Sequence, residues 1–273
     1  MPVPDEKKFI FVVYQLFKIK PFVRILIICL TFLFFSCSEA DKPEKVTVAV
    51  AANLQFAMKE IALEFEKKHH IKVEVSSGSS GTLTTQIKHG APFDLFVSAN
   101  LRYPNKLFKD GMASKKPKTY AFGSLIMWST ENQDFTDGIE SLKSSSFLKI
   151  AVANSETAPY GIAALEALET ANLLTTLDKK LVYGESVGQV NQYVKSGAVD
   201  VGLTSKSVLF SLPESERGSW GEIDPSLYTP IEQGIVMLKQ GEVNNLENAT
   251  LFYDFMFSDQ VKEILKTYGY DIK

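Results

Sequence analysis

Hydrophobic positions follow two alternating patterns from Val46 to the end of the chain. Short apolar runs with β-branched residues, such as Val46 to Val50, predict buried strands. Longer stretches with apolar residues at helical spacing predict amphipathic helices, the first over about 54–68. The same reasoning predicts further strands at 72–76, 95–97, 124–128, 148–153, 199–203 and 234–238, and helices at 82–89, 161–173, 187–195, 246–257 and 259–268.

The order of these elements predicts the fold class. Strand–helix–strand order favours parallel sheets covered by helices on both faces. The pattern starts again near residue 123, and the last elements return to the first unit. We therefore expect an α/β protein of two lobes, with lobe I over 45–122 and 233–273 and lobe II over 123–232. A cleft between two lobes is a preferred place for a small ligand.

The first 36 residues have a different pattern. Basic residues between positions 18 and 24 lead into an apolar run over 25–35, and Ser36 offers a small residue at a cleavage point. These three features are typical of an export signal. The run has 11 residues, whereas spanning a bilayer takes about 20. We expect residues 1–36 to be a signal peptide, and a retained membrane segment is the alternative.

Cys37 follows this apolar run directly. Its surroundings, LFFSC at 33–37, resemble the bacterial lipoprotein signal, in which the cysteine becomes the lipidated first residue. That pattern usually has leucine three residues before the cysteine, where this chain has Phe34; the alternative is an incidental thiol. The only other cysteine, Cys29, lies in the leader, so the mature chain would form no disulfide. Residues 37–45 then form a lipidated start and polar linker.

The charge balance limits the partners. The full chain has a formal net charge of −3, and without residues 1–36 it keeps 24 basic and 30 acidic residues, a net charge of −6. This balance argues against a nucleic-acid partner, because no basic surface is available to follow a phosphate backbone. An acidic protein that binds an anion needs a site of neutral hydrogen-bond donors.

Two segments offer such donors between a predicted strand and a predicted helix. They are AAN at 51–53 and SSGSSGT at 76–82. A helix N-terminus exposes unpaired backbone N–H groups and a partial positive charge, so it binds anions readily. Asn53 and Ser80 can add side-chain donors, while glycines allow close approach of the backbone. The alternative is that Asn53 and Ser79 or Ser80 are simply N-caps.

Longer motifs extend these segments over most of the chain. They are AANL (51–54), SGSSGTL (77–83), GAPFDLFVSA (90–99), PYG (159–161), YTPIEQG (228–234) and KTYGY (266–270). In order and spacing they resemble the molybdate-binding periplasmic proteins of ABC importers, over residues 45–273. The resemblance implies a periplasmic-binding-protein type II fold, in which each lobe is a mixed, mainly parallel sheet flanked by helices.

The resemblance also implies a ligand set. The family's residue at the start of the first helix matches Asn53, and the serine of its glycine–serine loop matches Ser80. Its contact at the start of a second-lobe helix matches Tyr160, and a backbone N–H contact matches Val187. For Tyr160 and Val187 the alternative is a packing role alone.

One family contact is absent. Some members add a tyrosine hydroxyl after the strand that corresponds to 199–203, where this chain reads GLTS at 202–205. We hypothesise that Tyr160 supplies the missing hydroxyl from the other side. Ala52, Ser79 and Ser205 are secondary candidates for ligand contacts.

No catalytic set is recognisable in the sequence. The three histidines lie at polar positions, and no HExxH, CxxC, GxSxG or P-loop motif occurs. A secreted serine hydrolase using Ser80 is a remote alternative; it would need a histidine partner, and the pattern nominates none of the three histidines. An iron(III) carrier would use paired tyrosines such as Tyr160 and Tyr183, but the helix starts at Asn53 and Ser80 suit an anion better.

The expected protein is therefore an extracytoplasmic solute-binding lipoprotein. It captures molybdate or tungstate between its lobes and delivers the anion to a membrane-bound ABC permease. We expect a monomer that is no enzyme, carries no cofactor and is held on the outer side of a membrane by lipid on Cys37. A sulfate- or thiosulfate-binding protein of the same fold is the alternative, because these anions share charge and shape with molybdate.

Overall fold

The computed structural model describes residues 45–272, and these residues contain two five-stranded sheets. The predicted signal peptide (1–36), Cys37 and the linker up to residue 44 lie outside the described residues. Within 45–272, each sheet with the helices packed on it is called a lobe below. Lobe I contains the sheet that includes the first strand of this range, and lobe II contains the other sheet.

The sheet of lobe I has the strand order β2-β1-β3-β10-β4. Strands β1, β2 and β3 are mutually parallel, because β1 lies between β2 and β3 in parallel register. Strand β10 is antiparallel to both β3 and β4. The bounds are β1 (Lys45–Ala51), β2 (Lys72–Gly78), β3 (Leu95–Ser98), β4 (Lys118–Gly123) and β10 (Ile231–Met237).

The sheet of lobe II repeats this plan with the order β7-β6-β8-β5-β9. Strand β6 lies parallel to β7 and β8, whereas β5 is antiparallel to β8 and β9. The bounds are β5 (Leu125–Ser129), β6 (Ile150–Ala153), β7 (Leu181–Gly184), β8 (Val201–Ser205) and β9 (Ser219–Glu222). Two mixed sheets flanked by helices confirm the predicted fold class.

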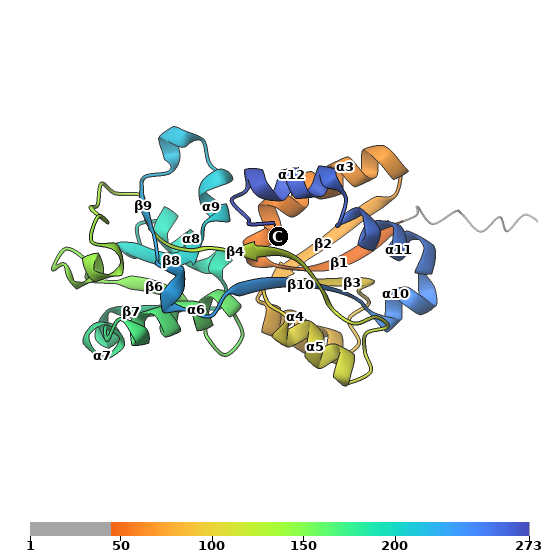
Figure 1. Cartoon of the computed structure of the whole chain (residues 1–273), viewed down its shortest axis with the longest axis horizontal. Helices are drawn as coiled ribbons and strands as arrows, with labels where there is room; N and C mark the ends of the chain where they lie inside the picture. Colours follow the sequence, from red (N-terminus) through yellow and green to blue (C-terminus); the bar gives the residue numbers. More distant parts are fainter. Residues whose placement is uncertain (1–44, 273) are drawn as a thin grey trace, which may run out of the picture. The chain divides into compact units, whose positions relative to one another are not determined.

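The chain passes between the two sheets twice. It leaves lobe I after Gly123 and enters lobe II at Leu125; it leaves lobe II after Glu222 and re-enters lobe I at Ile231. Figure 1 shows the two sheets with these connecting segments between them. The strand that follows each crossing is β5 in lobe II and β10 in lobe I. Each of them pairs antiparallel with a strand of the parallel part of its sheet, β5 with β8 and β10 with β3.

Helices cover both faces of the lobe I sheet. On one face, α3, α11 and α12 bury an aromatic-rich core around Phe65 and Phe252, whose rings meet edge to face at a centroid distance of 4.9 Å. On the other face, Leu83 of α4 and Leu107 of α5 pack against Phe96 of β3. The bounds are α3 (Gln55–His69), α4 (Ser80–Lys88), α5 (Arg102–Lys109), α10 (Lys239–Asn244), α11 (Leu246–Phe255) and α12 (Asp259–Thr267).

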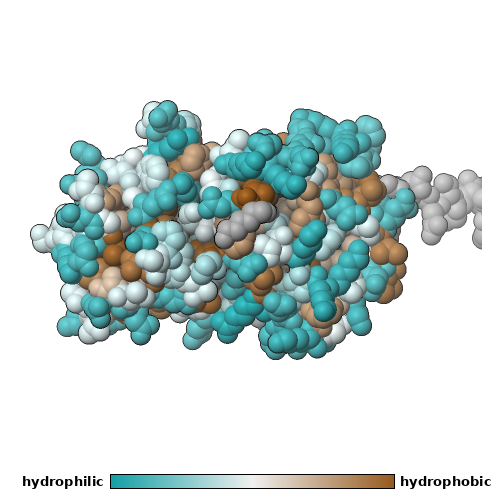
Figure 2. All heavy atoms as spheres, in the orientation of Figure 1, coloured by the Kyte–Doolittle hydropathy of each residue, from teal (hydrophilic) through white to brown (hydrophobic). Residues whose placement is uncertain are grey.

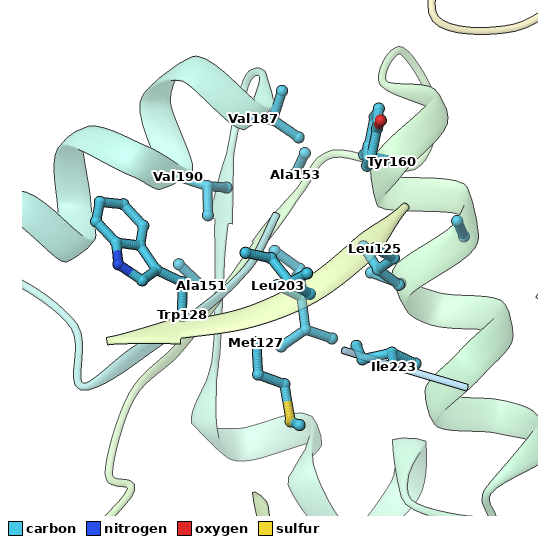
Figure 3. Packing of buried hydrophobic residues seen from close by; sticks show 14 of the residues in the cluster. Leu125, Met127, Trp128, Ala151, Ala153, Tyr160, Val187, Val190, Leu203 and Ile223 are labelled. Atoms are coloured by element: carbon cyan, nitrogen blue, oxygen red, sulfur yellow. The ribbon is translucent and has the colours of Figure 1, made fainter. Parts of the chain in front are cut away.

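The core of lobe II forms around its central strands. Helices α6 and α8 pack against β6 and β8, and Trp128 and Leu203 are buried in the same cluster (Figure 3). The bounds are α6 (Pro159–Thr170), α7 (Leu174–Leu177), α8 (Val187–Lys195) and α9 (Ser207–Phe210). Short 3₁₀ helices are η1 (Ala52–Leu54), η2 (Gly138–Lys143), η3 (Asp178–Lys180), η4 (Glu214–Glu216) and η5 (Pro225–Leu227).

Three strands were not predicted from the sequence, and all three lie at sheet edges. Strands β7 and β9 are the two edges of the lobe II sheet, and β4 is an edge of the lobe I sheet. Both β7 and β9 have four residues, several of them partly or fully exposed. An edge strand faces solvent along one side and needs no continuous apolar run, so the hydrophobic pattern missed it.

The hydrophobic residues of the described range gather mainly in these buried clusters. The face shown in Figure 2 is largely hydrophilic, with hydrophobic residues in separate patches. Among residues 45–272, no helix has both the length and the apolar character to cross a membrane.

Candidate functional site

A small cavity of about 10 Å³ lies where the two lobes meet. Its walls come from the carboxyl ends of β1, β2 and β3 and from the segments that follow β6 and β7. This is the usual place for a ligand in open α/β sheets. The lining residues are Ala51, Ala52, Asn53, Gly78, Ser79, Ser80, Ala99, Ala158, Pro159, Tyr160, Ser186 and Val187.

The starts of four helical segments meet at this cavity. Two come from lobe I: η1, which leads directly into α3, and α4. Two come from lobe II: α6 and α8, and Figure 3 shows Tyr160 and Val187 at the starts of these helices, near Ala153 at the end of β6. Each helix start carries partial positive charge, so the four together favour an anion.

Backbone N–H groups are available in three of these first turns. Ser80 and Val187 are the first residues of α4 and α8, and Tyr160 is the second residue of α6. Amides in the first turn of a helix have no acceptor within the helix. Among the described residues, none of the three backbone amides donates a hydrogen bond elsewhere. Pro159 lacks an N–H, so Tyr160 carries the first amide of α6.

The two serines of the glycine–serine loop have different roles. Ser79 is the N-cap of α4, where its Oγ accepts from the N–H of Thr82 at 3.2 Å. Ser80 Oγ instead accepts from the N–H of Ala99 at 3.1 Å, and the side chain is 1% exposed. Because this oxygen is already an acceptor, its O–H stays available as a donor. The capping interpretation therefore holds for Ser79 and not for Ser80.

Asn53 lies in η1 with 2% exposure and does not cap a helix. Its Nδ2 donates to Oε1 of Gln233 and to Oη of Tyr270, both at 2.9 Å. Its carbonyl oxygen accepts from Tyr270 Oη at 2.9 Å and from Ser207 Oγ at 2.7 Å. Its Oδ1 is buried and has no hydrogen-bond partner among the described residues. Asn53 is therefore held by three residues that do not line the cavity.

Tyr160 is almost fully buried at the meeting of the lobes. A Cβ added at Gly123 would lie 2.0 Å from Tyr160 Oη and 2.8 Å from the Nε2 of Gln233, so the absent side chain of Gly123 makes room for the hydroxyl. Burial raises the pKa of Tyr160 well above its ordinary value, which keeps the hydroxyl neutral. Gly123 and Gln233 do not line the cavity, and the backbone N–H is the group of Tyr160 best placed for a ligand.

Direct contacts join the lobes beside the cavity. The N–H of Gly81 in α4 donates to the carbonyl of Thr157 at 2.8 Å. Tyr103 of α5 donates from its hydroxyl to the carbonyl of Glu156 at 3.0 Å. A Cβ at Gly81 would lie 2.7 Å from the Cα of Thr157, so the approach of the lobes depends on glycine at this position.

The cavity wall is electrically neutral. None of the lining residues is a lysine, arginine, histidine, aspartate or glutamate. Across residues 45–272, no group of histidine, cysteine, aspartate and glutamate side chains is arranged to hold a metal ion. Asp94 lies outside the wall, where its Oδ2 accepts from the N–H of Thr47 at 2.7 Å and from Asn245 Nδ2 at 3.0 Å. The site therefore suits an anion held by neutral donors.

The enzymatic and iron-binding alternatives lack their partners at this cavity. No histidine lines it, so Ser80 has no base beside it. His89 is at the far end of α4 from Ser80, where its Nδ1 lies 2.8 Å from the carbonyl oxygen of Thr85. Tyr183 is 51% exposed on β7 and does not join Tyr160 in the cavity wall.

The structure thus brings six of the seven sequence candidates to one cavity: Ala52, Asn53, Ser79, Ser80, Tyr160 and Val187. Ser205 is set back from it and pairs with Ser207, with 3.0 Å between their Oγ atoms. Ser186 was missed, although it lines the cavity and caps α8 through the N–H of Gln189. The spacing of serine and glutamine at 186 and 189 was the available signal, because it matches a capping box.

Comparisons with known proteins point to one group. A profile of the family described as bacterial extracellular solute-binding protein matches residues 46–271. The molybdate-binding protein ModA of Azotobacter vinelandii is 36% identical over 235 residues, which cover 86% of this chain and 92% of the relative. A Bacillus subtilis protein, named provisionally as the ABC transporter substrate-binding lipoprotein YvgL, is 32% identical over 238 residues, covering 86% and 89% of the two chains.

A solved structure supports the same grouping. The periplasmic molybdate-binding protein of Azotobacter vinelandii matches this fold with a TM-score of 0.79 at 31% sequence identity. The match covers 84% of this chain and 99% of that protein. The similarity therefore includes both lobes and the segments that line the cavity.

Proposed function

The chain belongs to the family of bacterial extracellular solute-binding proteins, and we propose that it captures molybdate or tungstate for an ABC importer. The observation that carries this proposal is a neutral cavity at which four helix starts meet. A helix start supplies N–H donors and partial positive charge without a basic side chain. The relatives named for molybdate binding support this choice of anion.

In the proposed complex, lobe I holds the anion first. The hydroxyl and N–H of Ser80 and the amide of Asn53 are its donors, and lobe II adds the N–H groups of Tyr160 and Val187. Burying a dianion is costly unless most of its lone pairs accept hydrogen bonds. Donors from both lobes are therefore needed at once, which couples binding to contact between the lobes.

Delivery follows from this coupling. A protein whose lobes are held together by its ligand presents a different surface from one whose lobes are apart. A membrane permease can distinguish the two surfaces and so respond to the loaded protein. The proposal includes a binding protein that is no enzyme, needs no cofactor and acts as a monomer.

Export and anchoring form a separate part of the proposal. The family description places such proteins outside the cytoplasm. The basic, apolar and small residues before position 37 support cleavage there and lipidation of Cys37. The relative named as a lipoprotein supports the same arrangement. Growth with labelled palmitate tests it: label should be incorporated in the full chain and be lost in Cys37→Ser.

Calorimetric titration of residues 38–273 tests the ligand. Molybdate, tungstate, sulfate and phosphate are compared for the parent protein and for the double variant Asn53→Ala/Ser80→Ala. We expect tight binding of molybdate and tungstate, much weaker binding of the other two anions, and loss of binding in the double variant. Each lost hydrogen bond to a charged ligand costs about 1.5–3 kcal/mol.

Other outcomes have definite meanings. Tight sulfate binding with weak molybdate binding would assign the protein to the sulfate alternative and keep the anion site. Absence of binding for all four anions would contradict the proposed function. Unchanged binding in the double variant would place the anion elsewhere in the molecule.

A further inference from the structure

Four buried polar side chains form a connected cluster behind the cavity: Asn53, Tyr120, Gln233 and Tyr270, called here the amide cluster. Their exposed fractions are 2%, 6%, 0% and 4%. Gln233 Oε1 accepts from Asn53 Nδ2 at 2.9 Å and from Tyr120 Oη at 3.3 Å. Tyr270 Oη accepts from Asn53 Nδ2 and donates to the Asn53 carbonyl, both at 2.9 Å.

The amide cluster uses both N–H bonds of the Asn53 side chain and leaves its oxygen unpaired. One N–H is directed to Gln233 and the other to Tyr270. The Oδ1 atom is buried and has no partner among the described residues. A buried polar atom without a partner is costly and requires an explanation.

The unpaired oxygen is the one atom of the amide that the cluster leaves free for a ligand. Asn53 lines the cavity, whereas Gln233 and Tyr270, which hold its nitrogen, do not. An amide oxygen only accepts hydrogen bonds, so it repels a fully deprotonated oxyanion. The side chain of Asn53 can donate to such an anion only after its amide turns and exchanges the positions of oxygen and nitrogen.

We propose that Gln233 is a positioning residue that sets the orientation of the Asn53 amide, and that anion binding turns both amides together. This inference rests on the proposed function. In the turned arrangement, Gln233 Nε2 donates to Asn53 Oδ1, and Asn53 Nδ2 donates to the anion. The turn gives up the present bond from Gln233 Nε2 to the carbonyl of Ile231, which is long at 3.3 Å. It also replaces the contact of Gln233 Nε2 with the Tyr160 hydroxyl, which would then donate to Gln233 Oε1.

Two tyrosine hydroxyls make this exchange possible. A hydroxyl donates and accepts, and its hydrogen rotates to suit its neighbours. Tyr120 donates to Gln233 Oε1 at present and would accept from Gln233 Nε2 after the turn. Tyr270 accepts from Asn53 Nδ2 and donates to the Asn53 carbonyl at present; after the turn its one hydrogen would go to Asn53 Oδ1, and the carbonyl would keep its bond from Ser207. Burial raises the pKa of Tyr120 well above its usual range, so its hydroxyl keeps its hydrogen.

The orientation of the amide also selects among oxyanions. The present arrangement offers an acceptor to the cavity and suits an anion that carries a hydrogen, such as hydrogen phosphate. The turned arrangement offers a donor and suits anions without hydrogen, such as molybdate and sulfate. Gln233 therefore influences specificity without touching the ligand.

The variant Gln233→Glu tests this role by titration with molybdate and phosphate at about pH 8.5. An ionised carboxylate only accepts, so it holds the Asn53 N–H bonds and opposes the turn. The added negative charge weakens the binding of both dianions, whereas the loss of the Asn53 donor weakens the binding of molybdate alone. We expect the ratio of molybdate to phosphate affinity to fall about 10- to 100-fold, which corresponds to one hydrogen bond to a charged group.

The matched control is Gln233→Met, which has a similar length but neither donor nor acceptor. It should lower the affinities for molybdate and for phosphate by the same factor, so that the ratio of the two affinities stays unchanged. Circular dichroism melting curves for both variants report whether the fold is retained. An unchanged ratio in a folded Gln233→Glu protein that binds either anion would overturn the positioning role.

Nuclear magnetic resonance of the parent protein gives a second test that needs no folded variant. The side-chain NH₂ signals of Asn53 and Gln233 are followed during addition of molybdate, with the exposed Asn244 as reference. Both signals should shift at the same equivalence point, whereas that of Asn244 should not. Binding of molybdate without a shift of the Gln233 signal would overturn the proposal. If the parent protein bound no oxyanion, the proposed function would fail first, and this inference would fail with it.

Discussion

Ser207 Oγ donates a hydrogen bond to the carbonyl oxygen of Asn53 at 2.7 Å, and this bond joins the two lobes beneath the cavity. Ser207 begins α9 of lobe II, whereas Asn53 lies in η1 of lobe I. The two residues are separated by 154 positions in the sequence. The bond fixes the backbone of a proposed ligand residue only while the lobes are together.

Replacement of Ser207 by alanine should weaken oxyanion binding modestly. The Asn53 carbonyl keeps its bond from Tyr270, so this acceptor stays paired, while the buried Ser205 Oγ loses its bond to Ser207 Oγ. A typical net hydrogen bond contributes about 1 kcal/mol, which corresponds to an affinity about fivefold lower. Calorimetric titration with molybdate measures the effect. Ser211→Ala is the control, because Ser211 follows the last residue of α9 and its Oγ donates to the Val208 carbonyl of the same lobe. Equal losses in both variants would contradict a role for the link between lobes.

The two adjacent serines at the start of α4 should respond differently to alanine. Ser80→Ala removes a donor proposed for the anion and should weaken binding about 10- to 100-fold. Ser79→Ala removes the cap on the Thr82 amide and should lower the free energy of unfolding by about 1 kcal/mol. Titration with molybdate and urea denaturation separate the two effects. A larger loss of affinity in Ser79→Ala than in Ser80→Ala would show that the roles are assigned to the wrong residues.

Gly81→Ala should oppose the close approach of the lobes. The new Cβ would lie 2.7 Å from Thr157 Cα and 2.9 Å from its carbonyl oxygen, and both are backbone atoms. Overpacking of this kind costs about 1–3 kcal/mol, so affinity for molybdate should fall about 5- to 150-fold. Small-angle scattering should show less compaction on ligand addition than in the parent protein.

Gly188→Ala is the matched control for that variant. Gly188 also faces the other lobe, but a Cβ there would meet the Ala52 Cβ at 3.4 Å, an ordinary contact. Its affinity should stay within about twofold of the parent value, because no backbone has to move. Equal losses in the two glycine variants would show that contact distance does not decide which glycine is required.

The first layer of the cavity could be predicted because its residues are encoded locally. Each lies where a strand pattern ends and a helix begins, as at Asn53, Ser80 and Val187. Such positions are visible in a single sequence, since hydrophobic period and small polar residues change together. The same local rule, applied to the serine and glutamine at 186 and 189, would have added Ser186 to the candidate site.

The layer behind the cavity could not be predicted in this way. Asn53 meets Gln233 and Tyr270 across 180 and 217 positions of sequence. No local pattern reports such contacts, because they depend on how β10 and the C-terminal segment return to lobe I. The hydrophobic pattern also predicts that α6 starts at 161, whereas it begins at Pro159. The earlier start places the backbone amide of Tyr160 in the first turn of the helix.

The buried tyrosines should make the protein sensitive to alkali. Burial raises the pKa of Tyr120 and of Tyr270 above the ordinary value for tyrosine. A raised folded-state pKa gives stability that is fully present below the unfolded pKa, about 10, and is lost as pH rises above it. Each such tyrosine should lower the free energy of unfolding by up to about 1.4 kcal/mol per pH unit in that range.

Urea denaturation between pH 8 and about pH 11.5, compared for the parent protein and Tyr120→Phe, measures this effect. The phenylalanine variant should lose stability less steeply above pH 10, because it has one buried hydroxyl fewer to ionise on unfolding. Tyr183→Phe is the control, since this ring is 51% exposed and the variant also lacks one hydroxyl. Parallel pH curves for the parent and Tyr120→Phe would show that the Tyr120 hydroxyl can lose its proton while the protein stays folded. The exchange of donors and acceptors inferred for the amide cluster could then not depend on the hydrogen of Tyr120.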